Sequence, residues 1–145
     1  MATTKFKAQY LSQYIQEIFG SPEQQEPLLT KNLSQKTKFH LKRLGNSLQA
    51  EYKQLIEQVR ELYDKYSEEY EGEDKKPKKR IKEEFKEQFT KEVEELDDVE
   101  VPITHDDFIE RDFIDKSTGD IVGGKVYFNL LDILIFEKQD AVTAE

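Results

Sequence analysis

The 145-residue sequence contains no cysteine and no tryptophan. Without cysteine the chain cannot form a disulfide, a thiolate zinc site, an iron–sulfur cluster or a cysteine nucleophile. No apolar run approaches the roughly 20 residues that a membrane-spanning helix needs, and the first residues lack the apolar core of a signal peptide. We therefore expect a protein that is made in the cytosol and does not contact a membrane.

The sequence also lacks the short motifs of common catalytic sites. It has no Gly-x-Ser-x-Gly nucleophile turn, no phosphate-binding P-loop and no dinucleotide fingerprint. Of its two histidines, His40 is expected to flank a helical seam and not to act as a base. The sequence therefore predicts a protein that is not an enzyme and binds no cofactor.

One cluster combines carboxylates with an imidazole, which are side chains that can bind a divalent cation. It consists of His105, Asp106, Asp107, Asp112 and Asp115. Its spacing matches neither a calcium loop nor a His-Glu-x-x-His helix. We therefore predict that these side chains cap turns or face solvent, and we expect no bound metal.

Hydrophobic residues make up only 36% of the chain and charged residues 37%, which favours an elongated helical protein with a thin core. The net charge of −9 is uneven, because residues 83–115 carry three Lys/Arg and fourteen Asp/Glu. This segment disfavours direct binding of nucleic acid, since phosphates require cations. It is either a solvated helix face, a site for a basic partner or an imitation of a phosphate strand.

Residues 1–20 are predicted to form an N-terminal helix, because apolar side chains recur there at spacings of three and four. Gly20 is well placed to end this helix. The aromatic-rich face either packs on the rest of the domain or docks into a groove of a partner. Its residues are Phe6, Tyr10, Leu11, Tyr14, Ile15, Ile18 and Phe19.

The strongest pattern lies in residues 34–96 and predicts a long antiparallel helical hairpin similar to a coiled coil. The first arm begins near Ser34 and runs to about Tyr70, and the second runs from about Lys79 to Leu96. A short connection between them favours antiparallel neighbours. The first arm has the seven-residue repeat of a coiled-coil seam, formed by Leu41, Leu48, Leu55 and Leu62 with Gly45, Tyr52, Val59 and Tyr66 interleaved.

The first arm is longer than the second, so its stretch from Phe39 to Leu48 must meet another element or another chain. Gly45 lies in this stretch, and we predict that it permits a close crossing by another backbone. The candidate partner-binding residues come from this stretch, from the first helix and from the acidic segment. They are Phe6, Tyr10, Tyr14, Phe39, Leu41, Leu48, Glu94, Glu95, Asp97 and Asp98.

The remaining segments complete a mainly α fold in a single domain spanning residues 1–145. Residues 99–127 are predicted to hold short extended pieces, including a small β-hairpin near residues 113–127, and residues 128–138 a C-terminal helix. The basic run at residues 75–80 follows a cluster of carboxylates. It therefore indicates local neutralisation at an exposed tip, although a nuclear-import signal or a phosphate-binding patch is an alternative.

Residues 52–131 contain a sequence of features that together indicate a family. These are a tyrosine-rich helix end, an acidic helix with phenylalanines, a short extended piece, an acidic cap and a leucine-rich last helix. The matching segments are Leu62–Tyr66, Glu83–Phe89, Glu94–Val101, Asp106–Phe108 and Leu130–Leu134. This order resembles a family of small phage-encoded helical proteins of unknown function, and it departs from the family in carrying the 113–126 hairpin. The resemblance implies a phage origin and a non-enzymatic role, and it transfers no functional residues.

Two functions are compatible with these expectations. The first is protein–protein interaction as a minor structural or assembly component of a phage, with phage or host proteins or a second copy as partner. The alternative is an acidic phage inhibitor that binds a basic host protein, as a mimic of nucleic acid. The corresponding location is the host cytoplasm or the virion.

Overall fold

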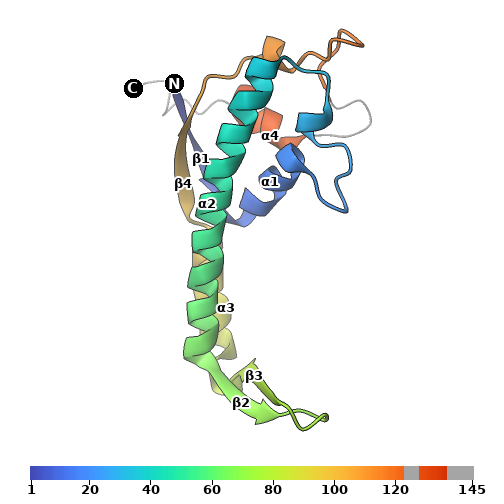
Figure 1. The fold of residues 1–145 in the computed structure, drawn as a ribbon. Helices are drawn as coiled ribbons and strands as arrows, with labels where there is room; N and C mark the ends of the chain where they lie inside the picture. Colours follow the sequence, from blue (N-terminus) through green and yellow to red (C-terminus); the bar gives the residue numbers. More distant parts are fainter. Residues whose placement is uncertain (123–127, 137–145) are drawn as a thin grey trace.

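The computed structural model describes residues 1–122 and 128–136, and it has the shape of a head carried on a stalk (Figure 1). Strands and helices pack around one core in the head. They are strand β1 (Ala2–Lys7), helix α1 (Leu11–Phe19), the first half of helix α2 (Gln35–Tyr66), strand β4 (Glu100–His105) and helix α4 (Asn129–Leu131). The stalk consists of the second half of α2, helix α3 (Lys86–Asp97) and the strands β2 (Ser67–Glu71) and β3 (Pro77–Ile81).

Single turns of helix link these elements. They are the 3₁₀ turns Ala8–Tyr10, Leu28–Thr30, Glu83–Phe85 and Glu110–Phe113, and the π-helical turn Asp132–Phe136 that follows α4. The C-terminal helix predicted over residues 128–138 is therefore one short helix and one π turn, and residues 137–138 lie outside the described part of the chain.

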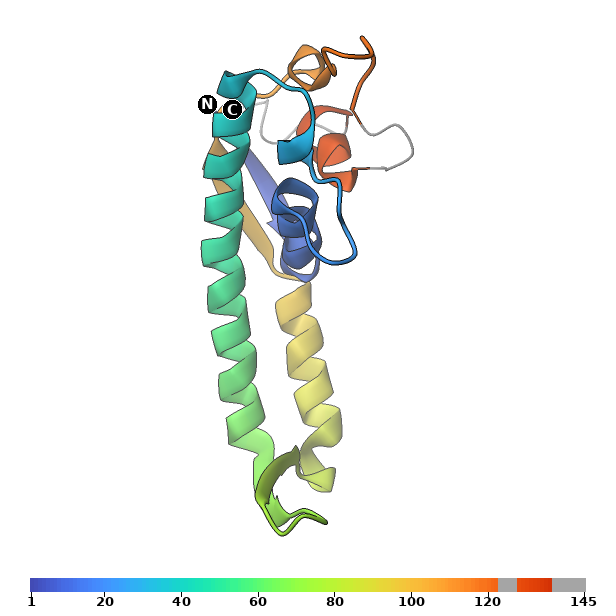
Figure 2. The same ribbon diagram turned by 45° about the vertical axis from the view of Figure 1, so that its right-hand side comes forward.

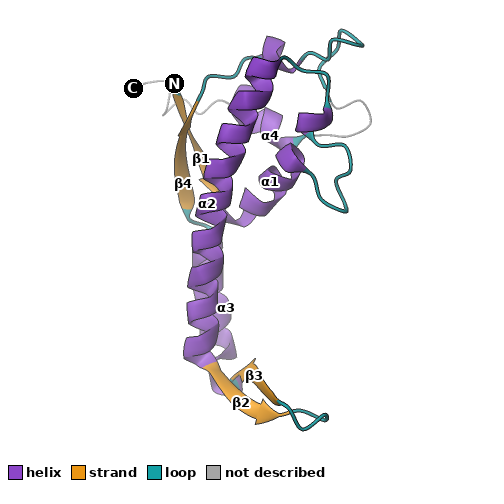
Figure 3. Ribbon diagram, viewed as in Figure 1, coloured by secondary structure: helices purple, strands orange, loops and turns teal. Residues whose placement is uncertain are grey.

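Strand β1 pairs with β4 in an antiparallel sheet, with Ala2 opposite His105 and Lys7 opposite Glu100 (Figure 3). The N-terminal helix predicted over residues 1–20 is thus wrong for residues 2–7. Thr4 and Phe6 are buried while the intervening lysines are exposed, which is the two-residue period of a strand. The helix proper begins only at Leu11, and Gly20 ends it with a φ of 99°, as predicted.

Helix α2 begins where the sequence predicts. Ser34 is its N-cap, and the Ser34 hydroxyl oxygen accepts a hydrogen bond from the Thr37 amide at 3.1 Å. The helix ends at Tyr66 instead of Tyr70, because the following residues pair with β3. Carboxylates on β2 face cations on β3, with Glu68 opposite Arg80, and this pairing favours strands over a further helical turn.

The long antiparallel helical hairpin predicted over residues 34–96 is wrong. Helix α2 is one long helix, whose first half packs in the head and whose second half lies beside α3 (Figure 2). Helix α3 has only 12 residues, and a two-stranded sheet stands where a short connection between the two arms was expected. The structure comprises 56% helix and 18% strand, so its two small antiparallel sheets are part of the fold that the mainly α prediction missed.

The heptad pattern led to the wrong prediction of a hairpin because the apolar face of α2 is continuous, whereas several separate elements cover it. Leu41, Leu44 and Leu48 are fully or almost fully buried in the head. Further along the same face, the Tyr66 ring lies 5.3 Å from the Phe85 ring at the start of α3. The seven-residue spacing therefore reports one long apolar face, which is covered in turn by α1, β4 and α3.

The β-hairpin predicted near residues 113–127 is reduced to one bridge between Ile114 and Ile121 in the described part of the chain. Gly119 occupies the turn with a φ of 79°, which favours glycine. Residues 123–127 of the predicted hairpin lie outside the described residues.

Gly45 allows α1 to pack closely on α2. A Cβ atom built on Gly45 would lie 2.6 Å from Cζ of Phe19, well inside van der Waals contact. The predicted close approach is present, but the approaching group is the Phe19 ring and not a backbone. This contact explains a glycine in a buried helical position, where it costs about 1 kcal/mol relative to alanine.

The effect of the Gly45→Ala substitution on the free energy of unfolding should depend on the residue at position 19 and should have opposite signs with phenylalanine and with alanine at that position. In the wild-type background we expect it to lower the free energy of unfolding by about 1–2 kcal/mol, because the methyl group overpacks the Phe19 ring. In a Phe19→Ala background it should raise that free energy by about 1 kcal/mol through helix propensity. Urea denaturation of the four variants measures both effects, and an effect of the same sign in both backgrounds would contradict the proposed contact.

Candidate functional site

The structure divides the candidate partner-binding residues into buried and exposed sets. Phe6, Tyr14, Leu41 and Leu48 are buried and belong to the core of the head, so they contact their own chain. Tyr10 is 43% exposed and Phe39 is 59% exposed. The exposed carboxylates are Glu94, Glu95 and Asp98, while Asp97 is half-buried.

An open hollow of about 520 Å³ lies beside Phe39, between α2 and the 3₁₀ turn Leu28–Thr30. We call this region the Phe39 surface, and it is formed by Leu29, Gln35, Lys38, Phe39 and Lys42. Within the described residues, Lys38 and Lys42 make no ion pair. An exposed aromatic ring flanked by unpaired cations is thus the most prominent feature of this side of the head.

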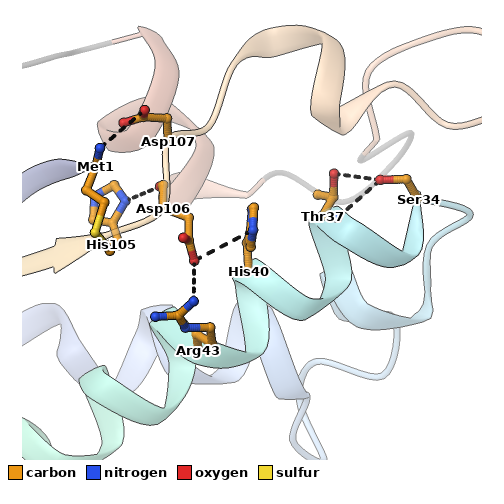
Figure 4. A network of polar contacts seen from close by, with 8 residues as sticks. All are labelled: Met1, Ser34, Thr37, His40, Arg43, His105, Asp106 and Asp107. Carbon is orange, nitrogen blue, oxygen red and sulfur yellow. Dashed lines mark hydrogen bonds and ion pairs between the residues drawn. The ribbon is translucent and has the colours of Figure 1, made fainter.

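The carboxylate of Asp106 lies beside Arg43, a cation next to the Phe39 surface (Figure 4). Its Oδ2 atom lies 3.6 Å from Nη1 of Arg43 and 3.8 Å from Nε2 of His40. The Arg43 guanidinium in turn lies 5.8 Å from the centroid of the Phe39 ring, within the range of a cation–π contact. Asp106, which directly follows β4, therefore orients a cation of α2 next to the exposed ring.

The His40–Asp106 pair resembles the base and the orienting carboxylate of a catalytic triad. The nearest hydroxyl groups in Figure 4, however, have another role. The Ser34 hydroxyl donates to the Thr37 hydroxyl at 2.9 Å and accepts from the Thr37 amide at 3.1 Å. The Ser34 hydroxyl therefore caps the start of α2, and the Thr37 hydroxyl is its second partner. A nucleophilic hydroxyl must lie within hydrogen-bond reach of its base. The hydroxyls of Ser34 and Thr37 are instead hydrogen-bonded to each other at the helix cap.

His105 is buried at the end of β4 and joins that strand to β1. Its Nδ1 atom lies 2.7 Å from the Asp106 carbonyl oxygen, and Nε2 lies 2.8 Å from the Thr4 hydroxyl. Since a carbonyl only accepts, Nδ1 carries the proton and Nε2 accepts from Thr4. Burial lowers the pKa of His105, and the hydrogen bond to Asp106 and the nearby carboxylates oppose this only in part.

The other acidic residues of the 105–115 cluster have separate structural partners. Asp112 accepts from the Ile109 amide at 2.9 Å and Asp115 from the Ser117 amide at 2.7 Å, so the predicted capping is confirmed for both. Asp107 lies 3.5 Å from the amino group of Met1. Across residues 1–122 and 128–136, no group of three or more His, Asp or Glu side chains is arranged to hold a metal ion.

A second exposed surface lies at the end of α3 nearest the head. The 3₁₀ turn that contains Tyr10 contacts α3, and the Ala8 amide donates to the Val99 carbonyl at 2.9 Å. Val99 is 47% exposed. We call this region the acidic surface, and it is formed by Tyr10, Glu94, Glu95, Asp98 and Val99. The structure thus places the turn that contains Tyr10 against the helix that carries Glu94 and Glu95, although the sequence holds them in separate segments.

The carboxylates of the acidic surface are placed at a cost to helix stability. They lie in and just after the last turn of α3, where the helix dipole is negative, and this turn contains no basic residue. In the described part of the chain none of Glu94, Glu95, Asp97 and Asp98 makes an ion pair. Folding alone therefore does not explain why four carboxylates gather at this end of the helix.

The basic run at residues 75–80 is neutralised within the stalk, as the sequence indicates. Arg80 lies 3.1 Å from Glu68, Lys79 lies 3.3 Å from Asp64 and Lys78 lies 4.0 Å from Asp74. Arg80 also lies over the ring of Tyr70, 4.5 Å from its centroid. Most cations of this run are therefore engaged locally at the tip of the stalk.

Sequence reasoning missed the residues that complete both surfaces, namely Lys38, Lys42, Arg43, Asp106 and Val99. A usable signal was present, because Phe39 lies outside the heptad seam of α2 with cations on both sides. An aromatic side chain at such a position faces away from the core. The contribution of Val99 and Asp106 depends on tertiary contacts, which one sequence does not reveal.

Comparison with protein-family models, curated proteins and solved structures finds no match to this chain. None of the helices in the described residues combines the length and the apolar character that crossing a membrane requires. The function must therefore be inferred from the two surfaces themselves.

The lowered pKa of His105 predicts a pH-dependent stability. The unfolded chain binds a proton as the pH falls below about 6.5, whereas the folded protein binds it only at lower pH, so stability should fall over that interval. Urea unfolding at pH 7.5 and pH 5.5 measures the change in free energy of unfolding. His105→Gln should reduce the change, and His40→Gln, in the same network, serves as the control. Equal pH dependence in wild type and His105→Gln would contradict the assignment.

Neutralising the carboxylates at the end of α3 should stabilise the protein. We expect Glu94→Gln and Asp98→Asn each to raise the free energy of unfolding by about 0.5 kcal/mol at low salt, through the helix dipole. The gain should disappear in high salt. Glu87→Gln is the matched control, because Glu87 lies in the first turn of the same helix and its removal should be destabilising. A loss of stability in Glu94→Gln and Asp98→Asn would show that unrecognised contacts hold these side chains.

Proposed function

We propose that the protein acts through protein–protein interaction without catalysing a reaction, as a minor structural or assembly component of a phage. One observation carries the proposal: two exposed surfaces on a narrow molecule each combine apolar side chains with charges that make no ion pair within residues 1–122 and 128–136. The Phe39 surface is basic and the acidic surface is negative. The phage assignment rests on the resemblance of residues 52–131.

The energetics of the two surfaces support binding over solvation alone. Aromatic side chains and arginine are the residue types that dominate the free energy of protein interfaces, and Phe39 with Arg43 provides such a pair. At the other surface, cations of a partner would remove the repulsion between Glu94, Glu95 and Asp98 and the helix dipole. Binding of a partner at either surface would therefore lower the free energy relative to the isolated chain.

A second candidate function, an acidic inhibitor of a basic host protein, is favoured by the same carboxylates. Glu94, Glu95 and Asp98 are exposed and unpaired within the described residues, so a basic groove can contact all of them. Such an interaction is steered by charge and weakens as the salt concentration rises. The two functions differ in the identity of the partner, which is a phage protein in the first and a basic host protein in the second.

Affinity capture from infected cells tests this proposal. We expect the full chain, carrying an affinity tag, to retain a defined partner at low salt, and mass spectrometry identifies it as a phage or a host protein. Glu94→Lys/Asp98→Lys should reduce retention of a partner of the acidic surface by about tenfold, because the new cations repel it. Lys53→Glu is the control, since Lys53 is exposed on α2 outside both surfaces.

Two outcomes would contradict the proposal. The first is a wild-type chain that retains nothing beyond the untagged resin at low salt. The second is a partner retained equally by wild type, Glu94→Lys/Asp98→Lys and Phe39→Asp, because neither surface would then take part in binding.

A further inference from the structure

Phe39 and the acidic surface lie on different sides of the molecule. Tyr66 contacts Phe85 at the start of α3, and it lies 27 residues after Phe39, or about seven and a half turns at 3.6 residues per turn. Phe39 therefore lies on the side of α2 opposite to α3. The buried residues Leu41, Leu44 and Leu48 lie on that far side as well, so Phe39 also faces away from the core of the head.

The same geometry orients the acidic surface. Phe89 of α3 faces α2, because its ring lies 6.3 Å from the Tyr63 ring. Asp98 follows Phe89 by nine residues, or about two and a half turns, and therefore lies on the outer side of α3. Figure 2 shows α2 and α3 side by side along the stalk, so their outer sides are the two opposite sides of the rod.

The two surfaces are complementary in charge and in apolar content. Lys38 and Lys42 are spaced by one helical turn, and Glu94 and Asp98 have the same spacing on α3. The apolar groups also match, because the exposed Tyr10 lies in the turn that contacts α3 and the exposed Val99 directly follows Asp98, while Phe39 and Leu29 line the open hollow of about 520 Å³. Each surface therefore offers the charge and the apolar contact that the other lacks.

We propose that the Phe39 surface of one copy binds the acidic surface of a second copy. Tyr10 and Val99 of the second copy occupy the hollow beside Phe39, and its Glu94 and Asp98 pair with Lys38 and Lys42. The inference rests on the proposed function and names a second copy of this chain as the partner.

The geometry determines the type of assembly that results. An interface between two different surfaces is head-to-tail, and it produces either a ring or an open chain. Since Phe39 and Asp98 lie on different sides of the rod, we expect further copies to add beyond a pair. The assembly is therefore an open chain or a ring of more than two copies, and its size increases with protein concentration and decreases with salt. In an open chain, the terminal copies leave one surface of each type free for other proteins.

Sedimentation velocity of the full chain at low salt is the first test. The wild type should form species larger than a dimer as its concentration rises, and these should dissociate at high salt. Phe39→Asp and Glu94→Lys/Asp98→Lys should each weaken self-association by about tenfold or more, because each places repelling charges at one surface. Lys53→Glu should associate as the wild type does. Circular dichroism establishes that all four proteins are folded.

Mixing the two defective variants is the decisive test. Phe39→Asp retains a normal acidic surface, and Glu94→Lys/Asp98→Lys retains a normal Phe39 surface, so together they can form one contact only. We expect each variant alone to be a monomer and the mixture to form a 1:1 dimer that does not grow further. A chain or a symmetric dimer formed by either variant alone would overturn the assigned interface, and so would a mixture that stays monomeric while the wild type assembles.

The outcome separates this inference from the proposed function. A wild type that stays monomeric at high concentration and low salt overturns self-assembly. If the same wild type retains a phage or host protein in a manner abolished by Phe39→Asp or by Glu94→Lys/Asp98→Lys, the interaction function stands with a different partner. If it does neither, both proposals fail.

Discussion

The apolar face of α2 is the constraint on which the rest of the structure depends. It runs along a 32-residue helix without a break, so elements far apart in the sequence must cover it in succession. Helix α1 and strand β4 cover the first half, and α3 covers the second. Because α2 runs through both the head and the stalk, the two parts share an axis. In the stalk, the outer sides of α2 and α3 face in opposite directions (Figure 2).

The distribution of charge follows from this arrangement. The stalk is only two helices wide, and none of the residues of α3 is fully buried, so most of its side chains remain at the surface. Cations of β3 at the tip of the stalk pair with carboxylates of β2, of α2 and of the turn between the strands. Within the described residues, Lys38 and Lys42 beside Phe39 and the carboxylates Glu94, Glu95 and Asp98 near the end of α3 make no ion pair, so the capacity for binding is concentrated at these two places.

Local features of the fold were predictable from the sequence because they depend on neighbouring residues. The cap at Ser34, the end of α1 at Gly20 and the capping by Asp112 and Asp115 all belong to this class. Strand β1 was mistaken for a helix, because its identity depends on pairing with β4 nearly 100 residues away. Of the two surfaces, the sequence identified the aromatic ring and the carboxylates, but the contacts that join Tyr10 to α3 and Arg43 to Asp106 are tertiary.

The sheet of β1 and β4 cannot form during translation until β4 has been synthesised. At about 5–20 residues per second, the ribosome needs roughly 5–20 seconds to deliver β4 after β1. Throughout that interval β1 has exposed backbone groups and no strand to pair with, a state that is prone to wrong association. The alternating lysines at positions 5 and 7 give the nascent strand a positive charge that opposes aggregation until the head closes.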